Sequence, residues 1–185
     1  MRRAAKRDYL LDTAIRLFNR HGYHATGVDR LIAETGIAKT TLYRHFGSKE
    51  ELIVAALAKV DEDARDELRT FVEAASNDPR TRILATFDQL AIWLADREFK
   101  GCLFVAAASE FGAPNDPVLQ QAQLHKRLTL AYFEELVRVA RIPEPKKIAR
   151  QIVMLHEGAI AFAQVLGHQG VADNAKQAAE RLIAA

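Results

Sequence analysis

The segment 36-GIAKTTLYRHFGSKEEL-52 carries residue types that bind phosphate groups. Its Lys39 is followed by two threonines, as in the loop that cradles nucleotide phosphates. That loop needs a glycine directly before the lysine and another five positions earlier, so that bare backbone N–H groups reach the phosphate oxygens. The two positions are Ala38 and Ala33 here, and no strand pattern precedes them. The spacing therefore argues against a nucleotide site and leaves the phosphates of a nucleic acid as the target.

Charge is unevenly distributed along the 185 residues, although the net charge is only +2. Residues 1–49 contain ten Lys or Arg and four Asp or Glu, which gives +6, whereas residues 50–185 contain sixteen and twenty, which gives −4. A compact basic end on a mildly acidic chain indicates an anionic partner for that end. The alternative is a solvated basic face without a partner, and charge alone does not choose between the two.

The composition, 49% hydrophobic and 27% charged, is that of a globular protein. The sequence contains no run of eighteen apolar residues, so no transmembrane helix is expected. The basic start of the sequence is not followed by the apolar core of a secretory signal. The single cysteine excludes an internal disulfide and fits a reducing compartment. We therefore expect a cytoplasmic protein without a membrane partner.

Helical periodicity and helix punctuation run through the whole chain, and no series of strands is predicted. The expected helices lie at about 4–21, between Thr26 and Gly36, at 39–46, from Ser48 through Phe71, and at 79–96, 102–111, 117–141, 146–167 and 172–184. The pattern thus predicts an all-α protein of about nine helices.

Capping residues support several of these boundaries. Thr26 is a plausible N-cap of the second helix, and Ser48 with Glu51 forms a capping box that begins the long fourth helix. Asp78 and Asp116 each precede a proline at the first helical position. The natural seam of the chain follows Gly47, where both charge balance and helix length change.

The two short helices on either side of Gly36 have the spacing of a helix-turn-helix. Leu42 and Phe46 are four positions apart and are expected to face inward with Ile37. The outward positions of the second short helix carry hydrogen-bond donors and cations: Lys39, Thr40, Thr41, Tyr43, Arg44 and His45. A recognition helix in the major groove of DNA needs side chains of this kind.

Residues 26–52 resemble the DNA-binding signature of TetR-type transcriptional regulators. The matching residues are Gly36-Ile37-Ala38, Thr41-Leu42-Tyr43, His45-Phe46 and Ser48-Lys49-Glu50-Glu51-Leu52, with Phe18, Gly22-Tyr23 and Thr26 upstream. The resemblance covers the first third of the chain closely and extends loosely to the end through length and helix count. It implies a DNA-binding domain at 1–48 and a helical effector-binding and dimerisation domain at 49–185. Family members often carry Gly, Ala or Pro in place of Thr40, so the operator sequence is not transferred.

The resemblance also implies roles for individual residues. Thr26 and Lys49 would hold phosphates with help from Tyr43 and His45, and the residues nearest the base edges would be Lys39, Thr40, Thr41 and Arg44. The N-terminus of the helix beginning at Ser48 favours a bound phosphate beside Lys49. The alternatives are partial packing for Tyr43 and a capping or surface role for His45. The basic residues Arg2, Arg3, Lys6 and Arg7 would form either a flexible arm along the DNA or a disordered tail.

A single helix-turn-helix reads few bases, whereas two related by a two-fold axis read half-sites about 34 Å apart. We therefore expect a homodimer, formed through the helices at about 146–167 and 172–184. The apolar positions that support this are Ile152, Leu155, Ala159, Phe162, Ala163 and Leu166 on the first helix, and Ala175, Ala178, Ala179 and Leu182 on the second. The alternative is that both are ordinary core helices of one subunit.

The middle helices are rich in large apolar residues with interspersed polar ones. The resemblance implies a pocket here for a small, mostly apolar effector, and the candidate lining residues are Trp93, Phe104, Phe111, His125, Met154 and Phe162. The alternative is a filled core. Cys102 is a candidate thiol sensor of oxidants or electrophiles, against the alternative of a buried, inert cysteine.

Other chemistry has little support. His21 and His24 flank a turn without a nearby Cys or carboxylate, so no metal site is expected. The acidic run at 61–67 is expected to face mostly solvent. The sequence contains neither a nucleophile elbow nor a zinc-protease motif. We therefore expect neither enzymatic activity nor a cofactor.

These observations predict a ligand-responsive DNA-binding repressor that binds a palindromic operator as a dimer and is released by its effector. Two rival interpretations remain. One is a small-molecule sequestering protein that keeps the motif without operator binding. The other is an architectural DNA-binding protein without a ligand.

Overall fold

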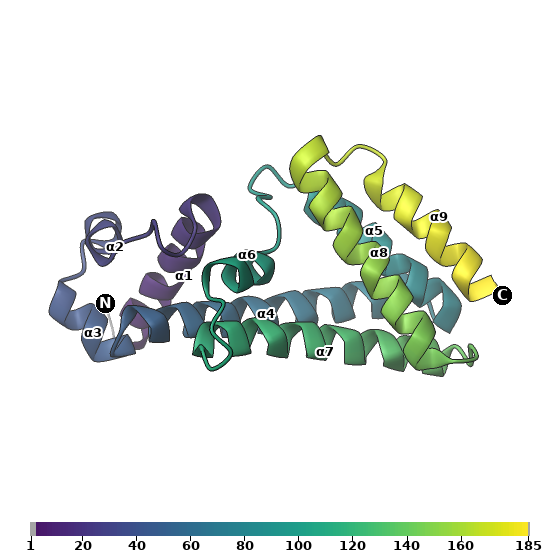
Figure 1. The fold of residues 1–185 in the computed structure, drawn as a ribbon, viewed down its shortest axis with the longest axis horizontal. Helices are drawn as coiled ribbons and strands as arrows, with labels where there is room; N and C mark the ends of the chain where they lie inside the picture. Colours follow the sequence, from purple (N-terminus) through teal and green to yellow (C-terminus); the bar gives the residue numbers. More distant parts are fainter. Residues whose placement is uncertain (1–2, 185) are drawn as a thin grey trace. The chain divides into compact units, whose positions relative to one another are not determined.

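The computed structural model describes residues 3–184, and within them the chain forms nine α-helices and no strand (Figure 1). The helices are α1 (Arg3–His21), α2 (Val28–Thr35), α3 (Lys39–Phe46), α4 (Lys49–Ala75), α5 (Pro79–Leu94), α6 (Leu103–Glu110), α7 (Pro117–Val139), α8 (Pro145–Leu166) and α9 (Val171–Ala184). The all-α prediction is confirmed, and the predicted helices correspond one to one with those observed. In this part of the chain no helix is both long and apolar enough to cross a membrane.

Most of the predicted helix caps are present. A carboxylate oxygen of Asp78 accepts the backbone N–H of Thr81 at 2.8 Å and caps α5. The hydroxyl of Ser48 accepts the backbone N–H of Glu51 at 3.0 Å before α4. Asp116 accepts a backbone N–H at 2.8 Å in the same way before α7. Each cap satisfies a donor that the first turn of a helix leaves unpaired.

The prediction of Thr26 as the N-cap of α2 is wrong. Gly27 occupies that position with an extended backbone, φ −72° and ψ 158°, and no side chain caps the helix there. The hydroxyl of Thr26 instead donates to the carbonyl of Gly22 at 2.7 Å and lies 3.3 Å from the carbonyl of Leu17. Its hydroxyl therefore points back toward the end of α1, away from the first turn of α2, where no side chain caps the helix.

Packing divides the chain into two compact units. The first contains the chain up to Asp63 together with residues 103–125, and the second contains residues 64–102 and those from Lys126 onward. The long helices α4 and α7 contribute to both units, whereas α6 belongs to the first unit with α1, α2 and α3. The predicted division at residue 48 concerns binding roles rather than packing and stays a prediction.

The core of the first unit is made of apolar residues from α1, α2, α3 and the start of α4. Fully or almost fully buried side chains are Leu10, Ala14, Phe18, Tyr23, Leu31, Leu42, Phe46, Leu52, Ile53 and Leu57. Tyr9 of α1 is 41% exposed and lies outside this core. The buried face of α1 runs through Leu10, Leu11, Ala14, Leu17 and Phe18.

The core of the second unit contains α5, α8 and α9, with residues from α4 and α7. Its large buried residues include Phe87, Phe133 and Ile152. Small residues of α8 and α9 are buried where these helices meet: Ala149, Ala159, Ala163, Ala172, Ala175 and Ala179. Much of the apolar face predicted for a dimer is therefore core within one subunit, as the alternative interpretation held.

Candidate nucleic-acid interface

The helix-turn-helix is formed by α2 and α3, which are joined by three residues. Gly36 ends α2 in the left-handed region with φ 66°, and its N–H donates to the carbonyl of Ile32 at 2.8 Å. This conformation suits a residue without a side chain. Leu42 is fully buried and Phe46 is 4% exposed, so these two residues fix α3 against the rest of the unit. The predicted inward face of α3 is confirmed.

The outward face of α3 carries the predicted contact residues. Lys39, Thr40, Tyr43 and Arg44 are exposed, whereas Thr41 and His45 are half-buried. Lys39 lies 3.7 Å from a carboxylate oxygen of Asp29 on α2, and both side chains are largely exposed. Such a surface pair is weak, so it leaves Lys39 free to change partner. The helix therefore presents two cations, the hydroxyl of Thr40 and the phenol of Tyr43 to solvent.

Lys49 is the first residue of α4 and approaches the turn between α1 and α2. Its ammonium nitrogen lies 3.5 Å from the carbonyl oxygen of His24. A helix N-terminus offers unpaired N–H groups to an anion, and Lys49 adds a positive charge at the same place. The phosphate contact of Lys49 stays a prediction, and the first turn also carries the carboxylates of Glu50 and Glu51.

Thr26 has different surroundings from the other predicted contacts. Its side chain is fully buried, and its hydroxyl donates to Gly22 rather than toward solvent. As placed, Thr26 closes the turn between α1 and α2. The prediction that it holds a phosphate has not been tested, and the geometry supports a role in shaping the turn.

The expected flexible arm or tail is wrong from Arg3 onward, because α1 begins at that residue. Arg7 lies on α1 with its guanidinium 5.1 Å from the ring centre of Phe46, which is a cation–π contact with the end of α3. Lys6 is an exposed residue of the same helix, and Arg2 lies outside the described residues.

The six candidate effector residues divide between the two units. In the first unit, Phe104 stacks on His125 at 3.6 Å between ring centres, and Phe111 stacks on His24 at 4.7 Å. In the second unit, Trp93 packs edge-on against Phe99, whereas Met154 and Phe162 are 67% and 58% exposed. The candidates thus occupy several different surroundings, and Met154 and Phe162 lie on an open surface of α8.

One acidic residue was missed by sequence reasoning. The acidic run at 61–67 was expected to face mostly solvent, and its other carboxylates are exposed, but Asp61 is only 4% exposed. Its carboxylate lies 2.7 Å from Nδ1 of His125, whose ring stacks on that of Phe104. A buried carboxylate needs such a partner, and the partner is 64 residues away in sequence.

His156, in the second unit, is a half-buried polar group. Its Nε2 lies 2.9 Å from the hydroxyl of Thr86, which donates its proton to the carbonyl of Ile83 at 2.6 Å. The hydroxyl therefore accepts from Nε2–H, which fixes the neutral tautomer. Phe87 and Phe133 cover the ring. Burial lowers the pKa of His156 to about 3, so the imidazole is neutral at physiological pH.

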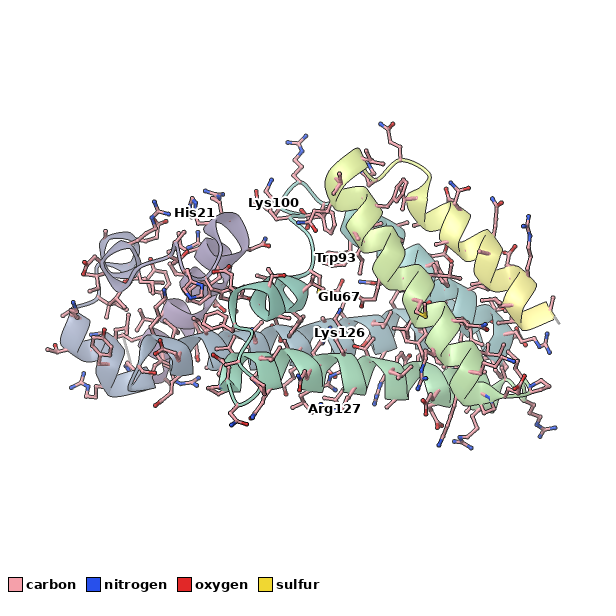
Figure 2. The ribbon with its side chains drawn as sticks, in the orientation of Figure 1. His21, Glu67, Trp93, Lys100, Lys126 and Arg127 are labelled. Carbon is pink, nitrogen blue, oxygen red and sulfur yellow. The ribbon has the colours of Figure 1, made fainter. Side chains whose placement is uncertain are left out.

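Cys102 lies just before α6 and is half-buried. Its sulfur is 3.5 Å from the ammonium nitrogen of Lys126, which is labelled on α7 in Figure 2. Lys126 also donates to a carboxylate oxygen of Glu157 at 2.6 Å. The thiol therefore has a cation beside it. Within residues 3–184 no group of three His, Cys, Asp or Glu side chains is arranged to hold a metal ion.

Comparison with known proteins identifies the fold and the motif. Residues 10–56 match the family described as bacterial regulatory proteins, tetR family, and residues 79–179 match the tetracyclin repressor-like C-terminal domain. The chain is 30% identical over 161 residues to the HTH-type transcriptional regulator LmrA of Bacillus subtilis, covering 85% of each chain. It is 22% identical over 178 residues to the HTH-type transcriptional regulator YjdC of Escherichia coli, covering 96% of this chain and 93% of that one.

Comparison with solved structures supports the same family. The TetR-family transcriptional regulator SCO4454 of Streptomyces coelicolor superposes with a TM-score of 0.88 at 29% identity, covering 98% of this chain and 95% of that one. These relatives are transcriptional regulators and not enzymes. With both family matches and the helix-turn-helix described above, the chain belongs to the TetR family of DNA-binding transcriptional regulators.

Proposed function

We propose that this regulator is a repressor that binds a palindromic operator as a homodimer and leaves it when a small effector binds. The observation that carries the proposal is the division of α3 into a buried face, Leu42 and Phe46, and an exposed face of cations and hydrogen-bond donors. Only a helix held in this way can enter the major groove without losing its own packing. The family includes activators as well as repressors, and repression is the sign of regulation that we propose for this chain. A regulator of this kind acts on the chromosome, which favours a cytoplasmic location.

On the DNA, we assign the residues to two roles. Lys49 holds a phosphate at the start of α4, with Tyr43 and His45 beside it, and Thr26 shapes the turn behind them. Lys39, Thr40, Thr41 and Arg44 lie nearest the base edges. Loss of a phosphate contact weakens binding to every sequence, whereas loss of a base contact changes sequence preference.

The homodimer is proposed to form through α8, with α9 alongside. Four apolar residues of α8 are exposed and recur at helical spacing: Met154, Phe162, Val165 and Leu166, with exposures of 58% to 80%. Gly158 lies on the same stripe and leaves space for close approach. Ile92 of α5, in the same unit, is also 62% exposed. An apolar stripe of this kind is typical of a surface that a partner covers.

The effector is proposed to bind in the part that follows residue 48. Aromatic side chains such as Phe87 and Phe133, which surround the half-buried imidazole of His156, favour a mostly apolar molecule. Coupling to DNA would pass along α4, which begins at Lys49 and continues for 27 residues. A change in its tilt would alter the spacing of the two recognition helices and spoil their fit to both half-sites.

The test is duplex binding by the purified protein, with the DNA upstream of its own gene, over a range of salt concentrations. We expect an even number of subunits on a short two-fold-symmetric site. Lys49→Ala should weaken binding to all duplexes and lower the salt slope, whereas Thr40→Ala should change sequence preference. Lys59→Ala, which removes a lysine paired with Asp63 at 2.6 Å, is the charge-matched control. Weak binding that is equal on all sequences would favour the architectural or sequestering interpretation instead.

A second kind of effector is favoured by the contact between Lys126 and Cys102. Modification of the sulfur would disturb Lys126 and, through it, Glu157. Under this proposal a thiol-alkylating reagent such as iodoacetamide releases wild-type protein from its operator and leaves Cys102→Ser bound. Equal release of both proteins would contradict the thiol-sensing proposal and would not affect the proposal that the protein is a repressor.

A further inference from the structure

The turn between α1 and α2, residues 22–26, is held by a carboxylate from α6. The backbone N–H of Tyr23 donates to Oε1 of Glu110 at 2.9 Å, and the backbone N–H of His24 donates to Oε2 at 2.6 Å. Nδ1 of His24 lies 2.7 Å from the same oxygen. Both oxygens of Glu110 are therefore engaged by one turn of the DNA-binding unit, and hydrogen bonds to an ionised acceptor are stronger than neutral ones.

The contact is extended by aromatic packing. Phe111, directly after α6, stacks on the imidazole of His24 at 4.7 Å and meets Tyr23 edge-on at 5.9 Å. At the other end of α6, the hydroxyl of Tyr23 donates to the carbonyl of Leu103 at 2.9 Å. The turn is therefore tied to both the first and the last residue of this short helix.

The turn is also shaped to receive the carboxylate. Gly22 has φ +82°, and a Cβ atom added there would lie 2.9 Å from Oε1 of Glu110. The carboxylate thus lies where any other residue would place its side chain. Burial would raise the pKa of Glu110, but the hydrogen bonds from the backbone of His24 and Tyr23 outweigh it and hold the pKa below its usual range. Glu110 is therefore ionised, as the contact requires.

The same turn supports a proposed DNA contact. The carbonyl of His24, one peptide group from the N–H groups that bind Glu110, lies 3.5 Å from the ammonium nitrogen of Lys49. The carbonyl of Gly22 accepts from Thr26 at 2.7 Å. Side chains from α6, from α4 and from the turn itself thus hold successive peptide groups of residues 22–24.

We propose that Glu110 is a positioning residue for DNA binding: it fixes residues 22–24 and, through them, Lys49 and the entry into α2. This inference rests on the proposed operator binding. Loss of the Glu110 carboxylate therefore loosens residues 22–24 and lowers operator affinity without any change in α3 itself.

The experiment is a double-mutant cycle on operator affinity with Glu110→Ala, Lys49→Ala and the double variant. We expect Glu110→Ala to weaken binding at least about tenfold, and the double variant to lose less than the product of the two single losses. If the two residues acted independently, the affinity loss of the double variant would equal the product of the two single losses within about twofold. Glu67→Gln, which removes one carboxylate from an exposed position of α4, controls for charge. The carboxylate of Glu67 is labelled in Figure 2.

Further measurements separate positioning from a general loss of structure. Hydrogen exchange at the amides of Tyr23 and His24 should accelerate at least about tenfold in Glu110→Ala, while amides of α5 and α9 stay protected. Glu110→Gln, which keeps one acceptor oxygen, should lose less affinity than Glu110→Ala and replaces it in the cycle if the alanine variant does not fold.

Each outcome has one meaning. If wild-type protein binds no duplex specifically, the proposed function fails and this inference fails with it. If wild-type protein binds but Glu110→Ala binds equally well, or the cycle is multiplicative, Glu110 has no positioning role while operator binding stands. A non-multiplicative loss together with faster exchange in the turn supports the proposal.

Discussion

Tyr23 and Glu110 are 87 positions apart in sequence, yet the N–H of Tyr23 lies 2.9 Å from the carboxylate of Glu110. The side chain of the same tyrosine reaches the carbonyl of Leu103, at the other end of α6, at 2.9 Å. One residue of the α1–α2 turn therefore contacts both ends of one helix. This double attachment makes the turn a defined junction rather than a loose connection.

Tyr23→Phe tests the second attachment. The side chain is 1% exposed, so removal of its hydroxyl loses a buried hydrogen bond without opening a large cavity. We expect a decrease of about 1 kcal/mol in the free energy of unfolding, measured by urea denaturation. Tyr9→Phe, at a position that is 41% exposed, is the matched control and should change little. Equal stability of both variants would mean that the hydroxyl contributes nothing.

Gly22→Ala tests the shape of the turn. A φ of +82° is strained for any residue with a side chain, and the new Cβ would meet Glu110 at 2.9 Å. We expect a loss of about 1–3 kcal/mol of stability and weaker operator binding. Gly112→Ala is the control, because a Cβ there meets nothing within 4 Å and its φ is not positive. A thermal melt of the two variants beside wild type would show the contrast.

The fold was predictable because its signals are local. Glycines, capping residues and helical periodicity lie within a few positions of the boundaries they set, as Gly36 does for α2 and Ser48 for α4. Tyr9 and Leu10 of α1 are both apolar by type, yet Tyr9 is 41% exposed and Leu10 is fully buried, a difference that residue type alone does not carry. Thr26 fits a cap by residue type, but its hydroxyl donates to the carbonyl of Gly22, just after the end of α1.

The site was predictable only in part. The residues of α3 share one short motif, so the sequence could group them. The contacts of Asp61 with His125 and of Tyr23 with Glu110 join residues 64 and 87 positions apart, and a single sequence carries no signal of such pairs. The predicted dimer face was difficult to assign because apolar residue type does not separate core positions from exposed ones. Ala159 and Ala163 are apolar for packing within the subunit, whereas Phe162 between them is exposed.

Phe162→Glu tests the proposed dimer. Phe162 is 58% exposed in the single chain, so a charge there costs little in the monomer but a great deal in an apolar interface. We expect dissociation to monomers at micromolar concentration and a loss of at least about 2 kcal/mol in dimer stability, measured by sedimentation. Val139→Glu makes a similar change at a 44% exposed position of α7 and should leave the dimer intact. A dimeric Phe162→Glu variant would place the interface elsewhere.

His156 predicts a dependence of stability on pH. The pKa of His156 is lowered to about 3 in the folded protein, whereas an unfolded histidine has a pKa of 6.5. Between these values the unfolded chain binds more protons than the folded chain, so stability increases with pH. The contribution is fully present above pH 6.5 and is lost progressively as the pH falls toward 3. The maximum slope is about 1.4 kcal/mol per pH unit for each subunit.

The comparison of wild type with His156→Gln isolates this effect. Glutamine can donate to the hydroxyl of Thr86, as Nε2–H does at 2.9 Å, but it takes up no proton. The free energy of unfolding of both proteins is measured with urea at several pH values between 7 and 5. As the pH falls, wild type should lose stability relative to the variant. His168→Gln, at an exposed position between α8 and α9, should run parallel to wild type. If the difference for His156→Gln is the same at every pH, protonation of this imidazole does not control stability, and acid unfolding must begin at the carboxylates instead.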